Sequence, residues 1–357
     1  MHNSDDTRYS IDLPQTELPL SHHSLPRNTI LRHGEAEDEG ATFEVMRRAM
    51  GFEMRKEMHS AIRDHLRQSP GCSFWVAEET PRFARPRIVG YARSIIRDRV
   101  LCITEFFVLP DHHQRGLGQS LLEHCLADAE HIGIEARMVL ASQHTGANSL
   151  YIRQLGCAPR LPMFLLAGSP NQLQLPREQQ GTVFDLHFTE PVRSGNPNLL
   201  FAEPIQLNAE IRATLQELDH TIVGFSRLPE HEFWCREVER GEGVARLFRR
   251  GSETGEIVGY AYTGVAFQGP LLAQSPEDLP RILHHTTQLF AHKNRLRDFS
   301  PLPQGFDSYC AVAGVCAPTL KWLLECGWQI IFQYQMLSSC PLGQPDRYIG
   351  HNPLYVL

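Results

Sequence analysis

Apolar residues recur at strand and helix spacings through the first half of the chain, from residue 29 to residue 167. Runs of β-branched and aromatic residues predict strands over residues 29–32, 73–78, 88–93, 103–110, 137–141 and 157–166. Apolar residues three and four apart predict helices over residues 41–54, 57–68, 117–132 and 147–155, the last ending at Gly156. This order predicts a mixed α/β domain in which helices flank a sheet.

The strand that ends at Val108-Leu109-Pro110 leads into the turn His113-Gln114-Arg115-Gly116-Leu117-Gly118-Gln119, which opens a helix. A helix start presents unpaired N–H groups and the positive end of the peptide dipoles, so it suits an anion. A Walker loop would need Lys-Ser/Thr after the last glycine, and a dinucleotide fingerprint would need a third glycine; both are missing. The turn therefore predicts a pyrophosphate cradle, and the alternative is an ordinary capped helix.

Two motifs resemble the GNAT acyltransferase superfamily. The turn from His113 to Gly118 is similar to the family's Arg/Gln-x-x-Gly-x-Gly/Ala acetyl-CoA loop, with His113 in place of Arg or Gln. Residues 144–157 are similar to its Asn-x-x-Ala-x-x-Leu-Tyr-x-x-x-Gly-Phe motif, with His144 at the Asn position and one residue more between Tyr151 and Gly156. The resemblance covers residues 29–167. It implies the GNAT fold and acetyl-CoA as co-substrate, bound by Val108, His144 and residues 113–119 (His113, Gln114, Arg115, Gly116, Leu117, Gly118 and Gln119).

Short stretches of the first half of the sequence recur in the second half. Ile88-Val89-Gly90-Tyr91-Ala92 recurs as Ile257-Val258-Gly259-Tyr260-Ala261, 169 residues later, and Gly156 has a partner in Gly327, 171 residues later. We therefore expect tandem GNAT-like domains, each a mixed, mostly antiparallel sheet flanked by helices. The expected boundaries are a flexible tail over 1–28, an active domain over 29–167, a linker over 168–198 and a degenerate domain over 199–357.

The second copy is expected to be inactive. Its strand-to-helix junction carries Ser275 as an N-cap, Pro276, and the carboxylates Glu277 and Asp278, which would repel a pyrophosphate. Trp322 stands at the position of Tyr151, and an indole cannot usefully protonate a thiolate.

The resemblance implies direct attack of a primary amine on the acyl-CoA thioester, with Tyr151 protonating the departing thiolate. A base must take the amine proton. Glu105 is the leading candidate, and Thr104, His144 and water remain open, because strand alternation lets only one of Thr104 and Glu105 face the pocket. An N–H of a splayed strand near Val108 would polarise the carbonyl. The acceptor pocket is expected beside the first two helices, with Gly51-Phe52-Glu53-Met54 as a wall.

Net charge and cysteine content argue against several classes of function and binding site. A net charge of −7 argues against a nucleic-acid binder, and the nine scattered cysteines contain no CxxC pair, so neither a zinc site nor a disulfide framework is indicated. We expect no metal, no signal peptide or membrane span, a cytoplasmic location, and a monomer with an internal pseudo-dimer or a homodimer. The expected partner is a small-molecule or peptide amine. A non-catalytic acyl-CoA-binding module is the alternative function.

Overall fold

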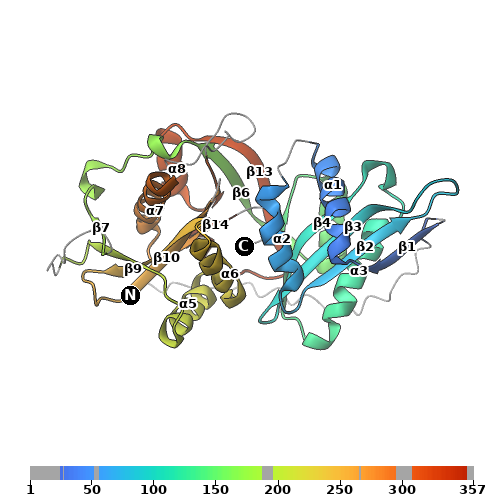
Figure 1. Ribbon diagram of the computed structural model, residues 1–357, viewed down its shortest axis with the longest axis horizontal. Helices are drawn as coiled ribbons and strands as arrows, with labels where there is room; N and C mark the ends of the chain where they lie inside the picture. Colours follow the sequence, from blue (N-terminus) through green and yellow to red (C-terminus); the bar gives the residue numbers. More distant parts are fainter. Residues whose placement is uncertain are drawn as a thin grey trace, which may run out of the picture.

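The computed structural model describes residues 25–26, 28–51, 56–186, 196–264, 267–294 and 308–351. The tail predicted over residues 1–28 lies almost wholly outside these ranges, and so do Phe52, Glu53 and Met54 of the predicted acceptor wall. Figure 1 shows two halves side by side, each with helices packed on a shared sheet.

The N-terminal half, residues 28–168, has the predicted order of elements. They are β1 Thr29–His33, α1 Glu39–Met50, α2 Glu57–Gln68, β2 Ser73–Glu79, β3 Arg87–Arg97, β4 Val100–Val108, α3 Leu117–Ala129, β5 Ala136–Ala141, α4 Thr145–Leu155 and β6 Ala158–Gly168. Helix α1 ends four residues earlier than predicted because Gly51 adopts a left-handed φ of 72° and caps it. Gly156 caps α4 in the same way, with φ 64°.

The C-terminal half, residues 200–351, repeats this order. Its elements are β8 Leu200–Pro204, α5 Ala209–Ile222, α6 Leu228–Glu239, β9 Gly243–Arg250, β10 Ile257–Gly264, β11 Phe267–Ala273, α7 Leu279–Asn294, β12 Ser308–Ala313, α8 Ala317–Glu325, β13 Gln329–Ser338 and β14 Tyr348–Gly350. Strand β7, Val183–Asp185, lies in the connecting segment and pairs with β8.

Both halves have the same strand pairing. Strands β1 to β4 pair antiparallel and β5 joins β4 in parallel; β8 to β11 pair antiparallel and β12 joins β11 in parallel. The expected mixed, mostly antiparallel strand pairing with flanking helices is confirmed in both halves.

The two halves exchange their long strands β6 and β13. In the described part of the chain all strands form one 14-stranded sheet, whose central order is β5-β13-β6-β12. Strand β13 of the C-terminal half thus pairs with β5 of the N-terminal half, while β6 pairs with β12. Strands β6 and β13 pair with each other antiparallel, with Ala158 opposite Ser338 and Ala167 opposite Gln329. Figure 1 shows these two strands crossing the middle of the molecule.

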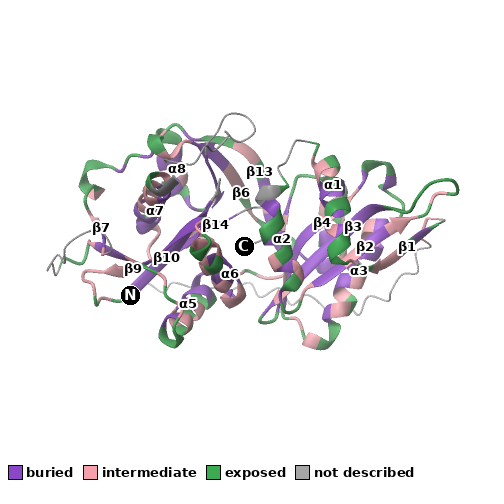
Figure 2. Cartoon of the chain, in the orientation of Figure 1, coloured by how far each residue is buried: buried purple, intermediate pink, exposed green. Residues whose placement is uncertain are grey.

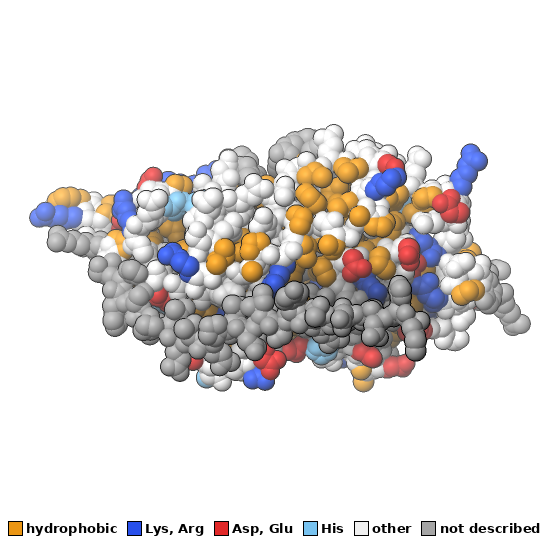
Figure 3. Space-filling model, turned by 180° about the vertical axis from the view of Figure 1, so that it is seen from behind, with side chains coloured by type: hydrophobic (Ala, Val, Ile, Leu, Met, Phe, Trp, Pro, Cys, Tyr) orange, Lys and Arg blue, Asp and Glu red, His pale blue; other side chains and the backbone are white. Residues whose placement is uncertain are grey.

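The buried core also extends from one half of the molecule into the other. Figure 2 shows the central strands buried and the outer helix faces exposed, and the largest apolar cluster contains residues of both halves. The halves are also joined by a buried ion pair between Arg97 of β3 and Glu230 of α6, which are 4% and 2% exposed. Some hydrophobic side chains remain on the surface, and Figure 3 shows several gathered on the rear face.

Candidate functional site

Strands β4 and β5 separate halfway along their length. They pair in parallel only from Val100↔Ala136 to Ile103↔Val139, whereas β3 stays paired with β4 as far as Val108. The separation begins at Thr104, which lies in a bulge between the pairs Ser94↔Ile103 and Arg93↔Glu105. In the described part of the chain no strand pairs with the edge of β4 beyond Ile103, so that edge is available to a ligand.

The direction of the backbone groups on this edge follows from the register. Leu109 donates its N–H to Val89 O of β3 at 2.8 Å. Alternation then turns the N–H groups of Phe106 and Val108 away from β3, toward the open edge. Val108 O accepts a hydrogen bond from Nε2 of His113 at 2.9 Å, so that carbonyl is occupied while the N–H remains available.

The start of α3 lies beside this edge. Gln114 and Gly116 both have left-handed backbones, with φ 59° and 77°. No side chain caps the helix and no acidic residue lies in its first turn, so the N–H groups of Gly116, Leu117 and Gly118 lack an intrahelical acceptor. Unpaired main-chain N–H groups therefore lie at the helix start where the sequence analysis expects a pyrophosphate to bind.

The side chains of the turn contribute unequally. His113, Gln114 and Arg115 are exposed, whereas Leu117 is buried in the core and can offer only its backbone. Gln119 donates its side-chain amide to Glu123 at 2.9 Å. A Cβ on Gly118 would lie 3.0 Å from Cζ of Phe106, so this glycine also allows α3 to pack closely on β4.

Tyr151 and His144 lie on the same face of the sheet as α3. The Tyr151 ring packs edge-on against Phe106 with centroids 5.7 Å apart, and burial raises the pKa of its phenol, so it stays protonated at neutral pH. His144 caps α4 by accepting the N–H of Ala147 on Nδ1 at 3.1 Å. Its ring lies 5.2 Å from that of His113, which brings the two sequence motifs together.

Glu105 faces the opposite side of the sheet, toward α1 and α2. One carboxylate oxygen lies 3.0 Å from Nε of Arg63, and the other lies 3.3 Å from Nη1 of Arg93. All three side chains are buried, and Arg93 also binds Glu39 at 2.6 Å. Glu105 is thus the centre of a buried charge network rather than an isolated carboxylate.

His59, on α2, is a candidate functional residue that the sequence analysis did not identify. It is buried one helical turn before Arg63, and burial lowers its pKa to about 4, so it is neutral at pH 7. The signal was present: His59, Ile62, Arg63 and Leu66 follow the i, i+3, i+4, i+7 pattern of a buried helix stripe.

The corresponding place in the C-terminal half is filled by the chain itself. Strands β11 and β12 pair directly only at Phe267↔Tyr309 and Gln268↔Cys310, and β14 then lies between them, bonded to both. A short 3₁₀ turn, Pro276–Asp278, precedes α7, where Asp278 pairs with Arg250 and with Arg281 at 2.7 Å. In this half β14 therefore occupies the gap between the strands, and a paired carboxylate lies at the helix start.

The counterpart of Tyr151 has a structural contact. Trp322 is buried and donates its indole N–H to Gln174 O at 2.9 Å. Among the described residues no group of three or more His, Cys, Asp or Glu side chains could hold a metal ion. No helix in the described ranges is long and apolar enough to cross a membrane.

Comparison with known proteins gives a family for the N-terminal half. Residues 41–157 match the model of the acetyltransferase (GNAT) family. Comparison with curated protein sequences gives no match.

Solved structures match nearly the whole chain. A Pyrococcus horikoshii protein described as an acetyltransferase aligns with 94% of this chain and 100% of its own, at 16% identity and a TM-score of 0.66. A GCN5-related N-acetyltransferase from Sphaerobacter thermophilus aligns over 88% and 96%, at 16% identity and a TM-score of 0.55. A tandem GNAT protein from the clavulanic acid biosynthesis pathway aligns over 88% and 99%, at 14% identity and a TM-score of 0.53. Residues 41–157 therefore form a domain of the GNAT acetyltransferase family, within a chain that has the fold of tandem GNAT proteins.

Proposed function

We propose that this protein is an acetyl-CoA-dependent N-acetyltransferase whose N-terminal half binds the coenzyme and transfers the acetyl group to a primary amine of a small molecule or a peptide. The observation that carries the proposal is the unpaired edge of β4 beside the uncapped start of α3. The C-terminal half has the same architecture with both features closed, so we assign coenzyme binding to the N-terminal half alone.

The residues fit the chemistry of coenzyme A. The N–H groups of Gly116, Leu117 and Gly118 would hold its diphosphate, which carries the negative charge that a helix start favours. The N–H groups of Phe106 and Val108 would bind the amide-bearing arm and the thioester carbonyl along the edge of β4. Exposed Arg115 and His113 lie at the mouth of the cradle, where they would meet the phosphates.

In the transfer, the amine nitrogen forms a bond to the thioester carbon and the bond from carbon to sulfur breaks. The amine loses one proton to a base, and the departing sulfur gains one from Tyr151. Tyr151 packs against Phe106, which lies on the open edge of β4, and burial keeps its phenol protonated before the transfer.

Each predicted base has another contact. Glu105 binds two arginines, Thr104 donates its hydroxyl to Arg93 O at 3.1 Å, and Nδ1 of His144 is used as a helix cap. These contacts favour water as the proton acceptor and a positioning role for Glu105. Replacement of Glu105 by Gln, described below, tests the assignment.

The proposal is tested by measuring acetyl-CoA binding by calorimetry, and CoA release with a panel of primary amines. Gly116→Ala places a side chain at φ 77° in the cradle, and Gly251→Ala imposes similar strain, at φ 75°, on a loop of the C-terminal half. We expect the first variant to lose acetyl-CoA affinity and the second to keep it. Equal affinity in both variants would contradict the location of the site. Acetyl-CoA binding without CoA release from any amine would favour a non-catalytic coenzyme-binding module.

A further inference from the structure

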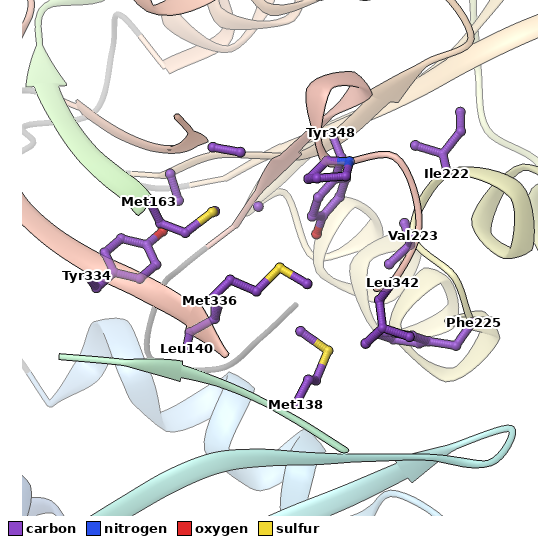
Figure 4. Close-up of a pocket in the computed structure, with 14 residues that line it drawn as sticks. Met138, Leu140, Met163, Ile222, Val223, Phe225, Tyr334, Met336, Leu342 and Tyr348 are labelled. Atoms are coloured by element: carbon purple, nitrogen blue, oxygen red, sulfur yellow. The ribbon is translucent and has the colours of Figure 1, made fainter. Parts of the chain in front are cut away.

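A cavity of about 60 Å³ lies between the two halves (Figure 4). Its walls are mostly apolar and come from both halves: Met138 and Leu140 of β5, Met163 of β6, and Met336 of β13. The strand exchange creates this cavity, because β13 lies directly beside β5, with Met336 opposite Leu140.

One polar group in the wall has no partner. The Tyr334 side chain is 1% exposed, and its hydroxyl makes no hydrogen bond within the described structure. Figure 4 shows this hydroxyl turned toward Met163, at the side of the cavity. An unsatisfied buried hydroxyl costs free energy that a ligand with a hydrogen-bonding atom would recover. The other lining tyrosine, Tyr348, already accepts a hydrogen bond from Arg227 at 2.5 Å.

The cavity begins where β4 and β5 separate. Ile103↔Val139 is the last pair between these strands, and Leu140 is the next residue of β5. Val139 and Ala141 pack with Tyr151 on one face of the sheet, so Met138 and Leu140 lie on the opposite face, which also carries Glu105. The cavity therefore lies on the side of the sheet away from Tyr151, next to the end of the pairing between β4 and β5.

We infer that this cavity holds the tail of the acceptor, and that the acceptor is a short aliphatic amine with a hydrogen-bonding oxygen at its far end. The inference rests on the proposed acetyltransferase function. A cavity of about 150 Å³ takes up benzene, so 60 Å³ admits only about two or three non-hydrogen atoms at the end of the tail. The apolar walls accept the carbons, and Tyr334 bonds the oxygen. The alkyl chain of a longer acyl-CoA would leave that hydroxyl unpaired, which is why the acceptor is the favoured occupant.

The test compares 3-amino-1-propanol with propylamine, using acetyl-CoA and CoA release. The wild type should favour the amino alcohol in kcat/KM by about three- to tenfold, the range for one neutral hydrogen bond. Tyr334→Phe should bring that ratio close to one. Tyr262→Phe is the control, because it removes a buried hydroxyl that is bonded to His231 at 2.8 Å and lies outside the cavity lining, and it should keep the ratio.

A second variant, Ala311→Leu, fills the cavity from β12. It should lower kcat/KM for both amines more than tenfold and abolish the rise in Tm that 3-amino-1-propanol produces in the wild type. A ratio that Tyr334→Phe does not change would overturn the inference. A loss confined to butyryl-CoA in Ala311→Leu would assign the cavity to the acyl chain instead, which also overturns it.

The two proposals fail in different ways. If 3-amino-1-propanol raises the Tm of the wild type but not of Ala311→Leu, and no amine is acetylated, the cavity ligand stands and the acetyltransferase function falls. If neither amine raises the Tm and other amines are acetylated, the function stands and the inference about the acceptor falls.

Discussion

The buried ion pair between the halves gives the most quantitative prediction. Glu230 accepts hydrogen bonds from Nε of Arg97 at 2.9 Å and lies 3.2 Å from Nε2 of His65. Burial alone would raise the pKa of Glu230, but its hydrogen bonds with His65 and Arg97 and the charge of Arg97 outweigh that effect and lower the pKa to about 2. The ordinary value is 4.5.

The lowered pKa is a contribution to stability. A difference of about 2.5 in pKa, at about 1.4 kcal/mol each, corresponds to about 3 kcal/mol that favours the folded state. A group with a lowered folded pKa gives its full contribution above its unfolded pKa, here 4.5, and loses it as the pH falls toward 2. About 1 kcal/mol should remain at pH 3.

Replacement of Glu230 by Gln removes this charge and leaves Arg97 buried without its partner. We expect the free energy of unfolding in urea to fall by about 3–5 kcal/mol at pH 7 and by much less at pH 3. The control is Glu325→Gln, since Glu325 forms an exposed pair with Lys321 and should change stability by less than about 1 kcal/mol at either pH. A loss below about 1 kcal/mol for Glu230→Gln at pH 7, or an equal loss at both pH values, would refute the reasoning.

Three further predictions concern the proposed site. Tyr151→Phe should lower kcat about 100-fold or more while the Kd for acetyl-CoA, measured by calorimetry, changes less than about twofold. Gly118→Val should drive a side chain into Phe106, lower stability by about 1–3 kcal/mol in urea unfolding and weaken acetyl-CoA binding, whereas retained affinity would show that close packing of α3 is unnecessary. Glu105→Gln should cost about 3–5 kcal/mol because two buried arginines lose a carboxylate; a 100-fold fall in kcat with little change in stability would restore Glu105 as the base.

Local features of the fold could be predicted from the sequence. Helix α2 has the predicted bounds, and the strands of the N-terminal half lie within a few residues of their expected positions, because apolar spacing reports directly which side of an element is buried. The loop at Gly116 and the cap at Gly156 were also predictable, since positive φ selects glycine.

The long-range features could not be predicted in this way. Alternation in β6 and β13 shows which residues face a core, but it does not say which strand is the neighbour, so the exchange was not visible. Strand β14 has only three residues and no usable pattern. The contact of Arg63 with Glu105 joins residues of a helix and a distant strand, and residue type alone does not distinguish such an arginine from one on a solvated face.

Because β6 and β13 are exchanged, each half contributes a strand that pairs with a strand of the other half. A chain cut after residue 168 would keep β6 but lack the strand that separates it from β5, and its exposed edges would favour self-association. Two separately produced fragments, split between β7 and β8, should instead assemble into a one-to-one complex when refolded together.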